Sequence, residues 1–211
     1  MERKQAQTNG ASGPPGKKSR AIRSDALRNE EVVIEAAKEV FAELGVDAPV
    51  REIAQRANVG MGTLYRRFPK RSDLIAAVFR REVDACTGEA SSFASSMPPG
   101  EALASWLRRY ARFIAAKRGL AAALHSGDPA YDALPNYFRA RFEPVLEALI
   151  AAAVEAKQVR SDISAFDLLR VIGNISTASG NDGERHTMHM LELLIDGLKY
   201  RSLHADRLAP S

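Results

Sequence analysis

Four cationic side chains fall within six residues, near the end of the first third of the chain. The four are Arg66, Arg67, Lys70 and Arg71. No acidic residue follows them before Asp73, and two hydroxyl donors, Thr63 and Tyr65, lie just upstream. Guanidinium, ammonium and hydroxyl groups are the donors that proteins use to bind phosphate. The cluster therefore indicates a nucleic-acid surface, with an ordinary solvated turn as the alternative.

Two short helices are predicted to hold this cluster. Pro49 suits the first position of a helix, because its missing N–H would have no partner there, and apolar residues recur at helical spacing over 50–57. The turn at 58–60 contains Asn and Gly, which tolerate positive φ. A second helix over 61–68 ends before Pro69, since the residue before a proline avoids the helical region. Two short helices joined by a tight turn form a helix-turn-helix, whose second helix can enter the major groove of DNA.

This second helix is predicted to read double-stranded DNA. We expect its cations and hydroxyl groups to hold phosphates, and Met61, Gly62 and Arg66 to lie nearest to the base edges. Residues 60 and 62 are glycines and have no side chain, so the backbone at the front of the helix could approach the duplex closely. Arg51, at the start of the preceding helix, is expected to contact the DNA backbone. The predicted DNA-binding set is Arg51, Met61, Gly62, Thr63, Tyr65, Arg66, Arg67, Lys70 and Arg71.

The stretch 29–74 resembles the TetR-like (TetR/AcrR) family of transcriptional regulators. The matching residues are Ala36, Ala37, Phe41, Gly45, Ile53, Ala54, Ala57, Val59, Gly62, Thr63, Leu64, Tyr65, Phe68, Arg71 and Leu74. Gly60 departs from the pattern, because the family often has a phosphate-binding serine there, and Arg67 replaces a frequent His or Tyr. The resemblance implies a DNA-binding regulator whose second domain binds a small effector and forms the dimer.

The chain shows helical periodicity and no strand period. We predict an all-α protein with an N-terminal three-helix helix-turn-helix domain and a helical-bundle ligand-binding and dimerisation domain. The net charge is +4 over 211 residues, and residues 1–24 hold six cations and one acid with almost no apolar residue. We predict that 1–24 is a disordered basic tail, either an arm that contacts DNA or a solvated segment without a role. The helix-turn-helix domain, including a linking fourth helix, is expected over 25–86, and the second domain over 101–204.

Individual helices follow from the apolar spacing and from turn residues. Outside the motif we expect helices over 29–44, 71–86, 101–117, 119–125, 136–157, 164–179 and 184–200. Residues 87–100 are rich in Ser, Gly and Pro and read as a connector. Pro144 is expected to kink the helix over 136–157 or to begin a new segment there.

Half of the aromatic residues gather between 106 and 142. Core packing explains each of them singly, but a group of aromatic residues beside a Gly/Pro loop is typical of an apolar pocket. Similarity to the TetR-like family implies that a small effector binds in this region. The predicted lining residues are Trp106, Tyr110, Phe113, His125, Phe138 and Phe142. We predict a small apolar or aromatic effector.

The last two helices carry small residues among large ones, which favours packing against a copy of themselves. A two-fold dimer reads two half-sites about one DNA turn apart, whereas one helix-turn-helix reads few base pairs. The alternative is that these helices only complete the core of the monomer. We predict a homodimer through the last two helices, bound to a palindromic operator.

Sequence marks of common enzymes and cofactor sites are missing. There is no glycine-rich phosphate loop, nucleophile elbow or two-Cys metal spacing. His186 and His189 lie three residues apart, but only Glu192 offers a third ligand, so we predict no metal and no cofactor. Cys86 is the sole cysteine. A lone cysteine on a helix more often packs inertly than acts as a redox sensor. A single cysteine fits a reducing compartment. The apolar runs are too short for a membrane span, and the N-terminus is polar, so we predict a cytoplasmic protein.

These features together predict a DNA-binding transcriptional regulator rather than an enzyme. We expect a repressor that a small-molecule effector releases by moving the linking fourth helix. Two alternatives remain at this point: a DNA-binding dimer without an effector, and a helical small-molecule-binding protein or enzyme.

Overall fold

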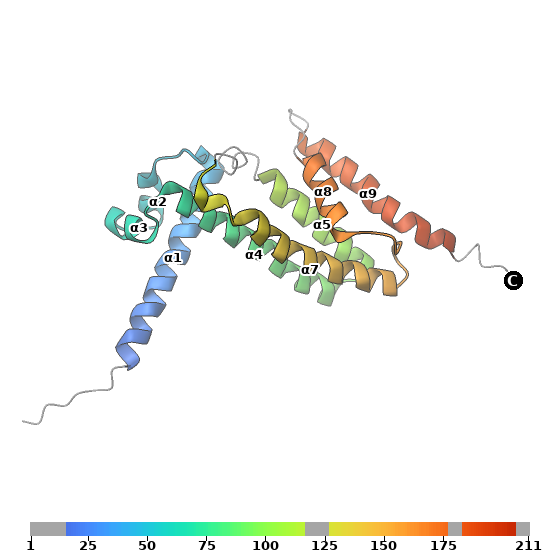
Figure 1. Ribbon diagram of the computed structural model, residues 1–211, viewed down its shortest axis with the longest axis horizontal. Helices are drawn as coiled ribbons and strands as arrows, with labels where there is room; N and C mark the ends of the chain where they lie inside the picture. Colours follow the sequence, from blue (N-terminus) through green and yellow to red (C-terminus); the bar gives the residue numbers. More distant parts are fainter. Residues whose placement is uncertain (1–15, 117–126, 177–182, 206–211) are drawn as a thin grey trace, which may run out of the picture.

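The computed structural model describes residues 16–116, 127–176 and 183–205, and all of its regular structure is helical (Figure 1). No strand occurs within these ranges, so the prediction of an all-α protein is confirmed. Three predictions lie outside the described residues: the disorder of 1–15, the helix over 119–125 with His125, and the continuation of a helix from 177 to 179.

The N-terminal unit consists of α1 (Gly16–Leu44), α2 (Val50–Arg56) and α3 (Met61–Arg67). We expected α1 to begin near Asn29 and the tail to reach Ser24, but the helix starts at Gly16. Neither Gly nor Pro occurs between Lys17 and Leu44, and strong helix formers fill the first turns, so nothing in the sequence stops the helix earlier.

Two residues with positive φ set the turns of this unit, as their types predicted. Gly45 (φ 82°) ends α1, and Asn58 (φ 52°) makes the tight turn between α2 and α3. A small apolar core then holds the three helices against the start of α4. Its members are Val33, Ala36, Ala37, Val40, Ala48, Ile53, Ala54, Ala57, Leu64, Phe68, Leu74 and Val78.

The linking helix α4 (Arg71–Ser96) is ten residues longer than we predicted, since we expected it to end near Cys86. The Ser and Thr residues that suggested a connector instead bond back within the helix. The hydroxyl of Thr87 donates to the carbonyl of Val83 at 3.0 Å, and that of Ser96 donates to the carbonyl of Ser92 at 2.7 Å. These bonds satisfy the hydroxyl groups without breaking the helix, so the connector to α5 is short.

The remaining helices form a bundle with α5 at its centre. They are α5 (Pro99–Ala116), the 3₁₀ turn η1 (Pro129–Tyr131), α7 (Leu134–Glu155), α8 (Ala165–Ser176) and α9 (Gly183–Ala205). The short turn η1 contacts α4. α5 contacts α4, α7, α8 and α9, so one continuous core runs from the linking helix to the last helix. Figure 1 shows α4 and α7 side by side, with α8 and α9 on the opposite flank of the bundle.

Pro144 lies inside α7, which continues through it as one helix. Of the two outcomes considered from the sequence, a new segment at Pro144 is therefore wrong. No described helix combines the length and apolarity needed to cross a membrane.

Candidate nucleic-acid interface

The short helix α3 rests on the core through one face and presents the other to solvent. Leu64 is 1% exposed and is the buried anchor of the helix, and Phe68 packs just after its end. Met61 and Tyr65, four residues apart, are 37% and 48% exposed. Gly62 and Arg66 are exposed in the same register, because residues four apart share one face of a helix. The outward face of α3 thus consists of these four predicted DNA-contact residues.

Backbone access on this face is open. A methyl group added at Gly60 or Gly62 would meet no described heavy atom within 4 Å. Gly60 precedes the helix in an extended conformation, and its carbonyl accepts hydrogen bonds from the N–H groups of Thr63 and Leu64 at 3.0 and 3.1 Å. The space in front of Gly60 and Gly62 is therefore open to a ligand in the described structure.

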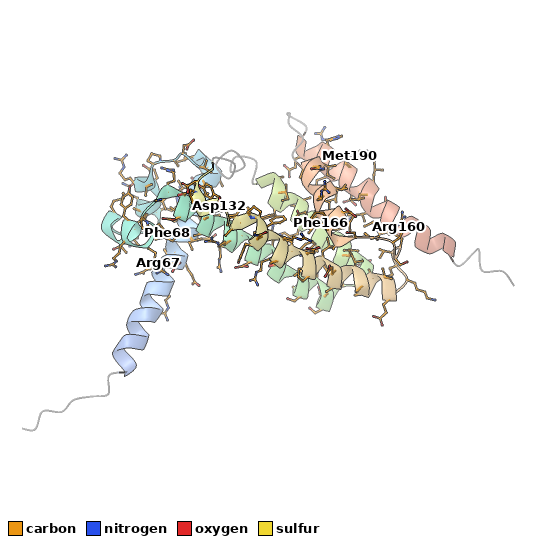
Figure 2. The ribbon with its side chains drawn as sticks, viewed as in Figure 1. Arg67, Phe68, Asp132, Arg160, Phe166 and Met190 are labelled. Carbon is orange, nitrogen blue, oxygen red and sulfur yellow. The ribbon has the colours of Figure 1, made fainter. Side chains whose placement is uncertain are left out.

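A small pocket separates α3 from α1 next to the outward face. It has a volume of about 170 Å³ and is lined by Asn29, Glu30, Val33, Thr63, Arg66 and Arg67. Nη2 of Arg67 donates a hydrogen bond to Oε2 of Glu30, which also forms its ion pair. Arg67 is therefore held at α1, and Figure 2 labels it next to Phe68 at the base of the helix-turn-helix.

The predicted cations after α3 have different surroundings. Lys70 is exposed at the start of α4, and its backbone N–H donates to Oδ2 of Asp73 at 3.0 Å. Arg71 instead turns towards the α1–α2 loop, where its Nη1 and Nη2 donate to the carbonyls of Val46 and Ala48 at 2.5 and 2.7 Å. The structure gives Arg71 an internal role that the sequence analysis did not foresee, because its acceptors lie more than twenty residues away.

The two arginines of α2 also differ: Arg51 is exposed, whereas Arg56 is bound to another part of the protein. The Arg51 side chain is 72% exposed, with Nη2 3.7 Å from Oε1 of Glu52. Arg56 binds Glu43 of α1 in a bidentate pair of 2.6 and 2.7 Å. This guanidinium lowers the pKa of the Glu43 carboxyl, chiefly through the hydrogen bonds. Arg56 therefore fastens α2 to α1, while Arg51 remains available to a ligand.

Comparisons with known proteins identify the family of this chain. The family model for bacterial regulatory proteins of the tetR family matches residues 33–78, and that for the C-terminal domain of SbtR-like transcriptional regulators matches residues 98–200. The crystal structure of the TetR transcriptional regulator SCO0520 from Streptomyces coelicolor is 36% identical with a TM-score of 0.68, covering 81% of this chain and 98% of that chain. This chain belongs to the TetR family of DNA-binding transcriptional regulators.

Two further relatives support the family assignment. A TetR transcription regulatory protein from Mycobacterium vanbaalenii is 31% identical with a TM-score of 0.65, covering 84% of this chain and 99% of that chain. An HTH-type transcriptional regulator of Staphylococcus aureus is 41% identical over 64 residues, which are 30% of this chain. The match spans about a third (35%) of the length of that curated relative. All of these relatives are regulators, and no enzyme family is indicated.

The second domain of this TetR-family regulator brings the predicted aromatic residues together. Trp106 and Tyr110 stack at 5.7 Å between ring centroids, and the rings of Phe138 and Phe142 are 4.6 Å apart. Phe113 joins the group at 5.3 Å from Phe142. Burial raises the pKa of the Tyr110 phenol well above its usual range, because the phenolate would lose its hydration. The five residues form one cluster in the bundle, in which four are buried and Phe138 is partly buried.

The aromatic cluster of the TetR-family regulator is joined to the linking helix α4. The ring of Phe113 lies 6.1 Å from that of Phe79, and Nε1 of Trp106 donates to the carbonyl of Cys86 at 3.2 Å. A polar group on the outer side of α4 makes a second connection. Oδ1 of Asp84 accepts hydrogen bonds from Tyr137 Oη at 2.7 Å and Arg141 Nε at 2.8 Å, both on α7. Sequence reasoning missed this group, since Asp84 lies more than fifty residues before its two partners.

The last two helices of this regulator expose large apolar side chains. On α8, Phe166 and Val171 are 39% and 43% exposed, and on α9 Leu193 is 53% exposed. The guanidinium groups of Arg139 and Arg170 lie 5.0 and 5.5 Å from the centroid of the Phe166 ring. Figure 2 shows Phe166 and Met190 on these two helices, far from the helix-turn-helix.

The two histidines considered as metal ligands are exposed on α9. No group of three or more His, Cys, Asp or Glu residues with metal-binding geometry occurs among the described residues.

Proposed function

We propose that this TetR-family regulator is a repressor that binds a palindromic operator as a homodimer and is released by a small apolar or aromatic effector. The observation that carries the DNA-binding part is the outward face of α3. A buried leucine fixes the helix to the core, while Met61, Gly62, Tyr65 and Arg66 project from the other side. A short second helix with such a face is suited to the major groove.

The predicted contacts divide by chemistry. Met61, Gly62 and Arg66 are assigned to base edges, because they lie at the front of the exposed face. Thr63, Tyr65 and Lys70 are assigned to phosphates, and the guanidinium of Arg66 is assigned to a phosphate as well. Arg51, on the preceding helix, is assigned to the DNA backbone. Arg71 is not retained in this set, because its guanidinium binds two carbonyls of the protein.

The dimer proposal rests on the exposed apolar side chains of α8 and α9. Phe166, Val171 and Leu193 would lose this exposure against a second copy of the same two helices. Burial of such residues at a two-fold interface is a major source of association energy. Occupancy of an operator by this dimer is sufficient for repression, because it blocks the DNA to other proteins.

The effector proposal rests on the contact between the aromatic cluster and α4. A ligand that separates the rings would displace Phe79 or Cys86, both of which belong to α4. Only three residues separate the end of α3 from the start of α4, so movement of α4 changes the position of the reading helix. A coupling free energy of about 1–3 kcal/mol between the two sites is enough for regulation.

The DNA-binding part is tested by fluorescence anisotropy with the intergenic DNA upstream of the gene. We expect Arg66→Ala and Tyr65→Phe to weaken binding, each by about 1–3 kcal/mol or less, and Arg66→Ala to reduce the salt dependence as well. The matched control is Arg112→Ala, an exposed arginine of α5 in the second domain. If Arg66→Ala and Tyr65→Phe bind as tightly as the wild type, α3 is not the reading helix.

A DNA-binding dimer without an effector is the second candidate, and the packing of the cluster favours it. Trp106, Tyr110 and Phe142 are each no more than 1% exposed, and their rings are in mutual contact. A thermal-shift screen with apolar, aromatic and cationic compounds separates the two candidates. A compound that stabilises the protein and weakens its DNA binding supports the repressor, whereas stabilisation by none supports the second candidate.

A further inference from the structure

A carboxylate of α1 lies next to the proposed DNA face of α3. Glu30 of α1 accepts a hydrogen bond from Nη2 of Arg67, which lies 37 residues later on α3. The arginine side chain is 54% exposed and the glutamate side chain 24%, so the pair lies at the surface rather than in the core. One of the two neighbouring arginines of α3 is thus already bound to an anion of the protein itself.

The same pocket shows how close this carboxylate lies to the proposed contacts. Asn29, Glu30 and Val33 form its wall on α1, and Thr63, Arg66 and Arg67 form its wall on α3. Thr63 and Arg66 are residues that we assign to the duplex. An anion held among them opposes a phosphate in the same place, because two like charges at short range repel.

Two roles for Glu30 are conceivable, and their magnitudes differ. An exposed ion pair adds little to folding stability, because water screens both charges. Its effect on DNA binding has a specific signature, the salt dependence of the affinity. Each cation that neutralises a phosphate changes the slope of log K against log salt concentration by about 0.9. Removal of one such cation therefore changes DNA binding measurably while adding little to the stability of the fold.

We propose that Glu30 is a positioning residue that acts as an internal substitute for phosphate. It holds Arg67 at α1 and lowers the affinity of the protein for duplex DNA of any sequence. This inference rests on the proposed function, since it assumes that the outward face of α3 meets DNA. Its consequence is that α3 delivers one phosphate-neutralising charge fewer than its cations suggest, which makes the bound protein easier to release.

The experiment measures affinity for a fluorescently labelled random-sequence duplex as a function of salt. Glu30→Gln keeps an acceptor for Arg67 but removes the charge. We expect its slope to be steeper by about 0.9, so that between about 50 and 200 mM salt it loses about 3.5-fold more affinity than the wild type. Arg67→Gln should keep the slope of the wild type, and Glu30→Gln combined with Arg67→Gln should restore it.

Two controls complete the set. Glu31→Gln removes the neighbouring exposed carboxylate of α1, which does not line the pocket, and its slope should stay at the wild-type value. Arg66→Gln should lower the slope by about 0.9, because Arg66 is assigned to the duplex. Circular dichroism checks that each variant is folded. If Glu30→Gln does not fold, the slope of Arg67→Gln still decides the test.

The outcomes separate this inference from the function on which it rests. Equal changes with Glu30→Gln and Glu31→Gln would mean a general charge effect and would overturn the role of Glu30. A slope lowered by Arg67→Gln would overturn it too, because Arg67 would then contact phosphate despite Glu30. In either case the proposed function stands if Arg66→Gln lowers the slope. If Arg66→Gln and the wild type have the same slope, both proposals are wrong.

Discussion

At the scale of single residues, Arg71 has the most specific role in the N-terminal unit. Its guanidinium is partly buried and closes the α1–α2 loop by donating to the carbonyls of Val46 and Ala48. Both acceptors are backbone groups, and a buried carbonyl without a donor costs free energy. The loop that positions α2 therefore depends on a side chain from the start of α4.

Replacement of Arg71 should destabilise the protein rather than only weaken DNA binding. We expect Arg71→Ala to lower the free energy of unfolding by about 2 kcal/mol, because hydrogen bonds to a charged group are lost. Arg71→Lys should recover little of this, since an ammonium group cannot reproduce the planar fork. Urea denaturation measures both, with the exposed neighbour Lys70→Gln as the control. Wild-type stability with lost DNA binding would instead make Arg71 a phosphate contact.

Cys86 is a buried residue of α4 whose thiol titrates abnormally. Burial raises its pKa from 9.0 to about 12, because desolvation of the thiolate outweighs the attraction of Arg109. The folded protein therefore keeps a proton that the unfolded chain loses above pH 9, so stability must fall as the pH rises from 9 towards 12. The neutral thiol at physiological pH fits inert packing better than redox sensing.

The prediction for Cys86 is a difference in pH dependence. Between pH 8 and pH 10 the wild type should lose about 1 kcal/mol more stability than Cys86→Ala, which has no thiol to ionise. Other titrating groups are common to both proteins and cancel in the comparison. Urea denaturation at the two pH values measures it. Parallel pH profiles would show that the thiol is hydrated in the folded protein.

At the scale of elements, α3 is a seven-residue helix that depends on its neighbours. Such a short helix is not stable alone in water, so packing of its buried leucine must supply most of its stability. Gly62 weakens the helix further, because glycine loses more conformational freedom on folding than alanine. The cost is explained if the DNA must approach the backbone at this position.

Gly62→Ala should therefore separate stability from binding. No described atom lies within 4 Å of an added methyl group, so we expect a gain of about 0.5–1 kcal/mol in stability. Affinity for the upstream DNA should fall about tenfold, the loss of roughly one good base contact. Gly88→Ala is the matched control, since Gly88 is exposed on α4 with equally open surroundings. Gly88→Ala should gain stability and keep the affinity for DNA. If Gly62→Ala also keeps its affinity, Gly62 does not belong to the interface.

At the scale of the whole molecule, the two ends of the chain are assigned to different surfaces. The helix-turn-helix and the pair α8 and α9 lie at opposite ends of the bundle in Figure 1. A two-fold axis through the second pair would relate two reading helices by symmetry, and a palindromic operator needs two reading helices related in this way. The linking helix α4 and its contacts with α7 then set the position of each reading helix.

The dimer prediction is tested by a charge placed on this surface. Val171→Glu or Leu193→Glu should convert the dimer into a monomer and reduce affinity for a palindromic fragment, because a buried unpaired carboxylate opposes association. Light scattering coupled to size-exclusion chromatography gives the mass. Leu44→Glu is the control, since Leu44 is 57% exposed on α1. A dimer that survives both substitutions would place the interface on another surface.

The sequence determined what depends on local chemistry. Helical spacing, the turn residues Asn58 and Gly45 and the proline after Phe68 fixed the helix-turn-helix and the all-α class, because each acts over only a few residues. Local reasoning failed where two signals compete. Ser and Thr at the end of α4 resembled a connector, yet their hydroxyl groups bond to the preceding turn and the helix continues.

Only the tertiary structure decided which cations face outwards. Arg66, Arg67 and Arg71 are equivalent in a pattern of charge, but Arg67 is bound to Glu30 and Arg71 to the loop after α1. Their partners are brought near by the packing of α1 against α2 and α4. Burial of apolar surface drives this packing, so the pattern of charges does not predict which charged groups meet. Spacing along the chain predicts the helices and their faces, whereas the partner of each charged group is fixed only when those faces meet.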